Sequence, residues 1–238
     1  MNKRMRIGAV VVIAVAVISV IYFSQQPSRD SQPDAAFNDM PAWQVIKEQD
    51  PAFHKRIQDQ MVVMQKEGKT EQQIIDAVQP QILKLQVGKL QHAPDENVVE
   101  YMRLNMEQTA AMQKVSDDDC FRFLYPAVKG GVNPMRVLDK SLMDRRMQAD
   151  VEMMRAAAGP DRHTVTQQER DTARADVAPI MQKLAKKYGD DFQLLQNPRK
   201  GVGKEKLSCD LVQDLWGNVL DLPEERAAGV IRLAVSEM

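Results

Sequence analysis

Apolar residues recur along most of the chain at intervals of three and four positions, which is the spacing of one face of an α-helix. Runs of β-branched residues are short outside residues 7–23, which disfavours strands. In the first half of the chain the spacing predicts three helices, whose stripes are Phe53, Ile57, Met61 and Met64; Ile74, Val78, Ile82 and Leu85; and Val99, Met102, Met106 and Ala110.

The second half continues the same helical spacing. A long stripe follows the chain breaks at Gly130-Gly131 and Asn133-Pro134 and ends at Gly159-Pro160. The stripes are Leu138, Leu142, Met143, Met147, Val151 and Met154; Ala173, Val177, Ile180, Met181, Leu184 and Tyr188; Leu211, Leu215 and Trp216 within 207–220; and Ala227, Val230, Ile231, Ala234 and Val235 within 223–238. Because the connections are short enough for antiparallel neighbours, the sequence predicts an all-α, irregular multi-helix bundle.

Polar residues that cap helices precede several of these stripes. Asp50 is followed by proline at the first helical position, and Thr166 has Glu169 three residues later, as in a capping box. Thr70 begins the second helix. Pro80 and a second proline at 179 fall inside two predicted helices, so we expect bends there.

Residues Ile7–Phe23 form an apolar run with no charged side chain. At about 1.5 Å per residue this run approaches the roughly 30 Å of a bilayer core. We interpret it as an uncleaved transmembrane anchor; the alternative is a signal peptide, which would need a shorter core and small residues at its cleavage site. Lys3, Arg4 and Arg6 precede the run, so the positive-inside rule places the N-terminus in the cytoplasm.

The chain therefore divides into four parts. Three prolines among short polar residues make 24–41 a flexible linker. The n-region is bacterial in style, so we expect a single-pass protein of the bacterial inner membrane with a periplasmic domain. The parts are 1–6, the cytoplasmic N-terminus; 7–23, the anchor that contacts the lipid bilayer; 24–41, the linker; and 42–238, the exported α-helical domain.

The charge balance bears on the class of partner. The whole chain has 32 Lys and Arg against 33 Asp and Glu, and three of the basic residues precede the anchor. The exported part is therefore mildly acidic, which disfavours nucleic acid as a partner.

The chain has two cysteines, Cys120 and Cys209, each near the start of a predicted helix. In an exported domain two cysteines normally pair, so we predict a disulfide between them. The segment SDDDC, which begins at Ser116, allows two other interpretations. Acidic neighbours disfavour a reactive thiolate, and three adjacent aspartates lack the alternating spacing of a calcium loop. We therefore interpret Ser116 and Asp119 as a helix cap.

No motif in the chain indicates a catalytic or metal site. His54, His92 and His163 are isolated in the sequence, and Gly201-Val202-Gly203-Lys204 lacks the other residues of a phosphate-binding loop. We accordingly expect no cofactor and no bound metal.

The chain is rich in methionine, with fifteen residues, several of them at helical spacing. Thioethers in an exported compartment could hold Cu(I), could form an adaptable groove for a partner's helix, or could fill an irregular core, and the last is favoured. If exposed, the large side chains are the candidates for contacts with a partner: Met102, Met106, Met143, Met147, Trp43 and Trp216.

These observations predict a protein that binds another protein and is not an enzyme. The partner would be an exported or envelope protein, and the class includes assembly factors, chaperones and immunity proteins. The alternative is a membrane-tethered hydrolase with acidic catalytic residues, which would need convergent carboxylates of raised pKa in a cleft.

Overall fold

The computed structural model describes residues 41–236, apart from the side chains of Glu71, Gln72, Ile75, Gln79 and Leu83. Within this range the chain is all-helical and has no strand, which confirms the predicted fold class. The predicted anchor at 7–23 and nearly all of the predicted linker lie outside the described residues. No helix between residues 41 and 236 is long and apolar enough to cross a membrane.

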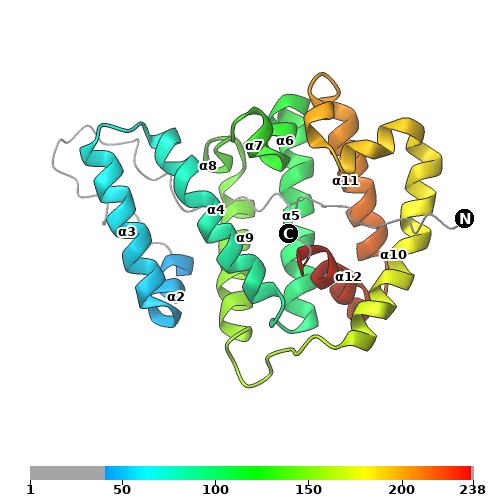
Figure 1. Ribbon diagram of the computed structural model, residues 1–238, viewed down its shortest axis with the longest axis horizontal. Helices are drawn as coiled ribbons and strands as arrows, with labels where there is room; N and C mark the ends of the chain where they lie inside the picture. The colour runs from blue at the N-terminus through cyan, green and yellow to red at the C-terminus, as the bar shows by residue number, and fades with distance from the viewer. Residues whose placement is uncertain (1–40, 237–238) are drawn as a thin grey trace, which may run out of the picture.

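The labels of Figure 1 are used for the helices from here on. The first half of the described chain contains α2 (Pro41–Gln49), α3 (Pro51–Lys66), α4 (Glu71–Leu90), α5 (Asp95–Val115), α6 (Asp117–Leu124), α7 (Pro126–Lys129) and α8 (Pro134–Val137). The second half contains α9 (Lys140–Ala156), α10 (Gln167–Tyr188), the 3-10 helices η3 (Gly189–Leu195) and η4 (Pro198–Gly201), α11 (Glu205–Leu220) and α12 (Glu224–Ser236).

The predicted helix starts are confirmed by the hydrogen bonds at the helix ends. The side chain of Asp50 accepts a hydrogen bond from the backbone N of Phe53 at 2.9 Å. Thr70 and Thr166 each begin a helix with a complete capping box. Pro80 lies inside α4 as an exposed residue, so the position that lacks an N–H donor faces solvent and the helix continues through it.

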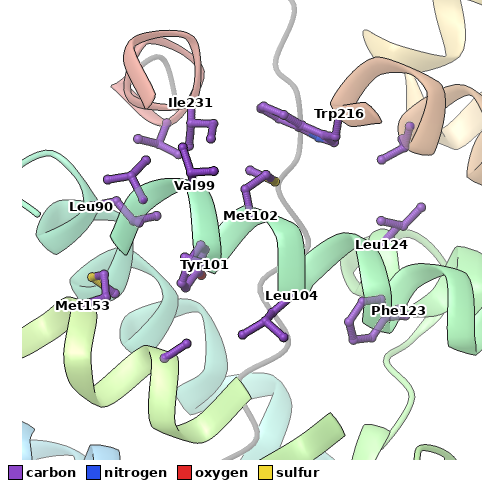
Figure 2. Packing of buried hydrophobic residues seen from close by; sticks show 14 of the residues in the cluster. Leu90, Val99, Tyr101, Met102, Leu104, Phe123, Leu124, Met153, Trp216 and Ile231 are labelled. Carbon is purple, nitrogen blue, oxygen red and sulfur yellow. The ribbon is translucent and has the colours of Figure 1, made fainter. Parts of the chain in front are cut away.

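Helix α5 occupies the centre of the molecule and packs against α6, α9, α11 and α12 (Figure 1). On one side α9 separates α5 from the N-terminal helices α2 and α3, and α4 crosses α9. On the other side α10 packs against α11 and α12. Figure 2 shows side chains of α5, among them Val99, Met102 and Leu104, packed toward several of these neighbours.

Some short elements were not expected from the apolar pattern. Helix α2 begins at the last residue of the predicted linker, and α7 and α8 have four residues each. Helices of one or two turns contain too few positions to show a 3.6-residue period. The chain breaks at Gly130-Gly131 and Asn133-Pro134 do occur, because these residues separate α7 from α9.

Candidate functional site: a charged cleft beside the disulfide

The structure places most of the predicted partner-binding side chains in the core. Met102, Met143, Trp43 and Trp216 are at most 2% exposed. The remaining two, Met106 and Met147, are partly buried against the same core. The stripes face neighbouring helices, so the methionines fill irregular space between them. In this structure the four buried side chains form no surface groove, and a site for a partner has to be sought elsewhere.

The two cysteines lie at the starts of neighbouring helices. Cys120 is the fourth residue of α6 and Cys209 the fifth of α11, and their sulfur atoms are 2.08 Å apart, as in a disulfide. Both residues are fully buried. The cap interpretation of the acidic run is also confirmed, because Ser116 Oγ accepts a hydrogen bond from the backbone N of Asp119 at 2.9 Å. The disulfide therefore joins the N-terminal turns of two helices.

A cleft of about 620 Å³ opens above these two helix starts. It is lined by the first turns of α6 and α11, by the end of α7, and by the turn that leads into α11. The lining residues are Asp117, Asp118, Lys129, Gly203, Lys204, Glu205, Lys206, Leu207 and Asp210. Seven of these nine side chains carry a charge, so the cleft is suited to polar and charged groups.

The centre of the cleft is a bridge between the two helix starts. The Nζ of Lys129 donates to Asp118 Oδ1 at 2.5 Å and to Glu205 Oε1 at 2.7 Å. The backbone N of Gly203 donates to the same oxygen of Glu205 at 3.0 Å. The hydrogen bonds from Lys129 and Gly203 lower the pKa of Glu205 to about 2. The hydrogen bonds with Asp118 and with Glu205 raise the pKa of Lys129, so both Lys129 and Glu205 are charged at neutral pH.

The other charged residues of the cleft have partners at its edges. Lys206 pairs with Asp210 one turn along α11, with Nζ and Oδ2 2.7 Å apart. Lys204 reaches away from the cleft to Asp191 of η3, at 2.6 Å. Gln113 of α5 donates to Asp210 at 2.9 Å. The lysine at the centre thus differs from the other two, because it bridges two carboxylates that belong to different helices.

The turn before α11 is shaped by two glycines. A Cβ atom at Gly201 would lie 2.5 Å from Ser208 Oγ and 2.7 Å from Phe121 Cε2, so only glycine lets this turn pack directly on α6. Gly203 has a φ of +84°, which is the left-handed region that favours glycine. Together they bring the backbone N of Gly203 to Glu205.

Two exposed apolar side chains are close in sequence to residues that line the cleft. Among the described residues, the large hydrophobic side chains that are exposed are Val63, Val115 and Val202, at 53%, 58% and 53%. Val202 precedes the lining residue Gly203, and Val115 lies two residues before Asp117. Val63 belongs to α3, at the far side of the molecule from α11 (Figure 1). Two of these three exposed valines are therefore close in sequence to residues that line the charged cleft, and neither is itself a lining residue.

A second group of charged side chains lies where α10 and α12 meet the start of α5. The guanidinium of Arg232, which is 1% exposed, pairs with Asp95 at 2.7 Å and with Glu169 at 3.1 Å. Glu169 also pairs with His163 Nε2 at 2.8 Å. Burial raises the pKa of Glu169, but the contacts with His163 and Arg232 outweigh it, so the net shift is downward. His163, isolated in sequence, thus belongs to a cluster that fastens three helices together.

The described residues also bear on metal and acid–base chemistry. No group of three or more His, Cys, Asp or Glu between residues 41 and 236 could hold a metal ion. Burial raises the pKa of Asp150, but its side chain lies in the core against Arg146 at 3.0 Å and not in the cleft. His54 is buried as well, with its ring centroid 4.4 Å from that of Trp43.

Sequence reasoning missed most of the cleft. It rejected Gly201-Val202-Gly203-Lys204 as a phosphate-binding loop and gave no role to Lys129, Glu205 or Val115. The one signal that could have located the site was the cysteine pair, because a predicted disulfide places the residues around Cys120 beside those around Cys209.

No protein-family model, no curated protein and no solved structure matches this chain.

Proposed function

We propose that this chain is a single-pass protein of the bacterial inner membrane whose periplasmic domain binds another protein at the cleft beside the disulfide. The anchor is residues 7–23, and the linker after it holds the domain close to the membrane. Tethering raises the effective concentration of the domain for partners in the envelope. The proposed partner is an exported or envelope protein.

The observation that carries this proposal is the pair of exposed valines, Val115 and Val202, that are close in sequence to lining residues of the charged cleft. An exposed large apolar side chain is ordinary when it stands alone, but apolar side chains close to a polar cleft resemble the surfaces of protein interfaces. The disulfide holds the two helix starts under the cleft in a fixed relation, so this surface needs little ordering when a partner binds.

The charges of the cleft favour binding over hydrolysis. A hydrolase that uses a carboxylic general acid needs a carboxyl group that is still protonated near neutral pH, whereas Glu205 has a pKa of about 2 and is held ionised by Lys129. A carboxylate that stays ionised can bind a positively charged group of another molecule. It does not suit general acid catalysis.

Site-specific photo-crosslinking in living cells tests the docking site. A photoreactive phenylalanine analogue placed at Val115 or Val202 should give the same adduct with an envelope protein. The same analogue at Val63 is the matched control, because that valine has a similar exposure and lies on α3. Adducts of equal yield at all three positions, or adducts at Val63 alone, would contradict the proposed site.

The topology is tested separately. A reporter that is active only outside the cytoplasm, fused after Met238, should be active. A mature chain that begins soon after Ser24 would show that the apolar run is a signal peptide and would remove the anchor from the proposal.

A further inference from the structure

The connection between α9 and α10 is the longest one in the part of the chain that the structure describes. It spans 157–166 and runs along the lower edge of the molecule in Figure 1, in yellow-green. Pro160, Asp161, Arg162 and Thr164 are all exposed. Exposed polar loops of this kind are where proteases preferentially cut a folded chain.

Beyond Pro160 this connection is held to the rest of the domain mainly at His163. The N–H of His163 donates to the carbonyl of His92 at 2.8 Å, and its ring pairs with Glu169 at 2.8 Å. Among the described residues, the N–H groups of Asp161 and Thr164 have no backbone acceptor. A protease has to draw several residues out in an extended form, and here few hydrogen bonds oppose that local opening.

Arg162 is the basic residue of this connection, and two other connections between described helices also contain one. The turn between α3 and α4 contains Lys69, whose N–H donates to the carbonyl of Met64 at 3.0 Å. The turn before α11 contains Lys204, whose N–H donates to the carbonyl of Gly201 at 2.8 Å. Both turns are short and closed by hydrogen bonds, so a protease would have to unwind the adjoining helices to cut there. Arg162 is therefore the most accessible of the three.

We propose that the connection between α9 and α10 is a proteolytic processing site, cut after Arg162 by an exported endoprotease specific for basic residues. The step is the hydrolysis of the peptide bond between Arg162 and His163 by one water. The oxygen of the water ends in the new carboxylate of Arg162, and its two hydrogens end on the nitrogen of His163, which becomes a protonated amine. The inference uses the proposed periplasmic location, but it does not depend on the partner or on the docking site.

The disulfide keeps the cut domain in one piece. Cys120 lies before the cut and Cys209 after it, so the two fragments stay covalently joined. Contacts also cross the cut, among them the ion pair of Arg232 with Asp95 at 2.7 Å and the packing of α5 against α11 and α12. The cleft takes its α6 and α7 residues from the first fragment and its α11 residues from the second. Processing therefore gives a two-chain domain that retains the cleft.

Limited digestion with trypsin tests the position of the site. The full chain in detergent micelles is treated with a trace of trypsin without reductant, and the fragments are identified by mass. Between residues 41 and 236 the first cut should follow Arg162. A cut after Arg29, in the predicted linker, is expected as well, because it only separates the domain from the predicted anchor.

Two variants make this digestion specific. Arg162→Gln changes an exposed side chain and should slow the first cut within the domain roughly tenfold or more, because the remaining basic residues require unwinding of a helix. Lys69→Gln is the matched control and should leave the rate unchanged. A first cut after Lys69 or Lys204, or equal rates for the wild type and Arg162→Gln, would overturn the inference.

Two further measurements test the two-chain product and the processing in cells. On a denaturing gel the trypsin-cut domain should run as one species without reductant and as two with it. In cells, a tag after Met238 should reveal a fragment that begins at His163 in the wild type and is absent from Arg162→Gln. Fragments that separate without reductant would overturn the two-chain product, and cells that contain the chain but not this fragment would overturn the processing site.

Discussion

Removal of the disulfide should destabilise this domain strongly. The double variant Cys120→Ala, Cys209→Ala deletes the bond and leaves a small apolar side chain at each buried position. Both cysteines are fully buried and join the starts of α6 and α11, so the variant changes little of the surface.

The expected magnitude follows from the length of chain that the bond closes. Cys120 and Cys209 are separated by 89 residues. In the chain-entropy account, closing a loop of this length lowers the entropy of the unfolded chain enough to stabilise the fold by about 4 to 5 kcal/mol. For a domain of this size that corresponds to a fall in Tm of roughly 8 to 20 °C.

Urea unfolding followed by tryptophan fluorescence measures this loss. The chain has two tryptophans, Trp43 and Trp216, and both are buried in the described domain, so the signal does not report on the apolar run at 7–23. With about 2 kcal/mol per M urea, the midpoint should fall by about 2 M. The wild type unfolded in the presence of reductant should match the double variant.

Two results would refute this reasoning. A loss of stability below about 1 kcal/mol would show that the bond does not restrict the unfolded chain as the loop length requires. Alkylation of both thiols in the native, unreduced protein would show that the bond does not form.

The remaining predictions concern packing and charge. Gly201→Ala should lower the stability by about 1 to 3 kcal/mol because the added Cβ would collide with Ser208 and Phe121. Gly217→Ala should raise the stability by about 0.5 to 1 kcal/mol because an added Cβ there meets no atom within 4 Å and alanine favours the helix. Thermal melting of the two variants compares these effects. Arg232→Met removes the buried partner of two carboxylates and should cost about 3 to 5 kcal/mol in urea unfolding. The pKa of Glu169 is lowered in the folded protein, so its contribution to stability is complete above its ordinary value near 4.5 and is lost as the pH falls through the folded pKa. Glu169→Gln should therefore flatten the acid limb of a plot of Tm against pH, and an unchanged limb would show that the cluster does not control it.

The fold class and most helix starts could be predicted because they depend on local patterns. The stripe of α3 and its cap at Asp50 lie within a few residues of each other, and so do Thr166 and Glu169 at the start of α10. Such features need no knowledge of the tertiary structure. The cysteine pair could be predicted as well, because the proposed compartment favours pairing of the two thiols that the chain has.

The cleft could not be predicted because its parts come from distant segments. Asp118 and Glu205 are far apart in the sequence, and only the packing of α6 against α11 brings them to the same lysine. The side chains of Met102 and Trp216 show a second feature that the sequence does not reveal. The sequence marks them as large and apolar, but whether such a side chain faces a partner or a neighbouring helix depends on the arrangement of the helices, which here buries both.

The most direct test of the central claim compares charged substitutions at the exposed valines. Full chains that carry Val115→Asp, Val202→Asp or Val63→Asp are purified from detergent-solubilised membranes, and the amount of the cross-linked envelope partner recovered with each is measured. All three changes are at exposed positions and should leave the Tm within a few degrees of the wild type. The account predicts that the partner is lost from the Val115→Asp and Val202→Asp chains and retained by Val63→Asp. Equal recovery with all three folded variants would contradict a docking site at the cleft.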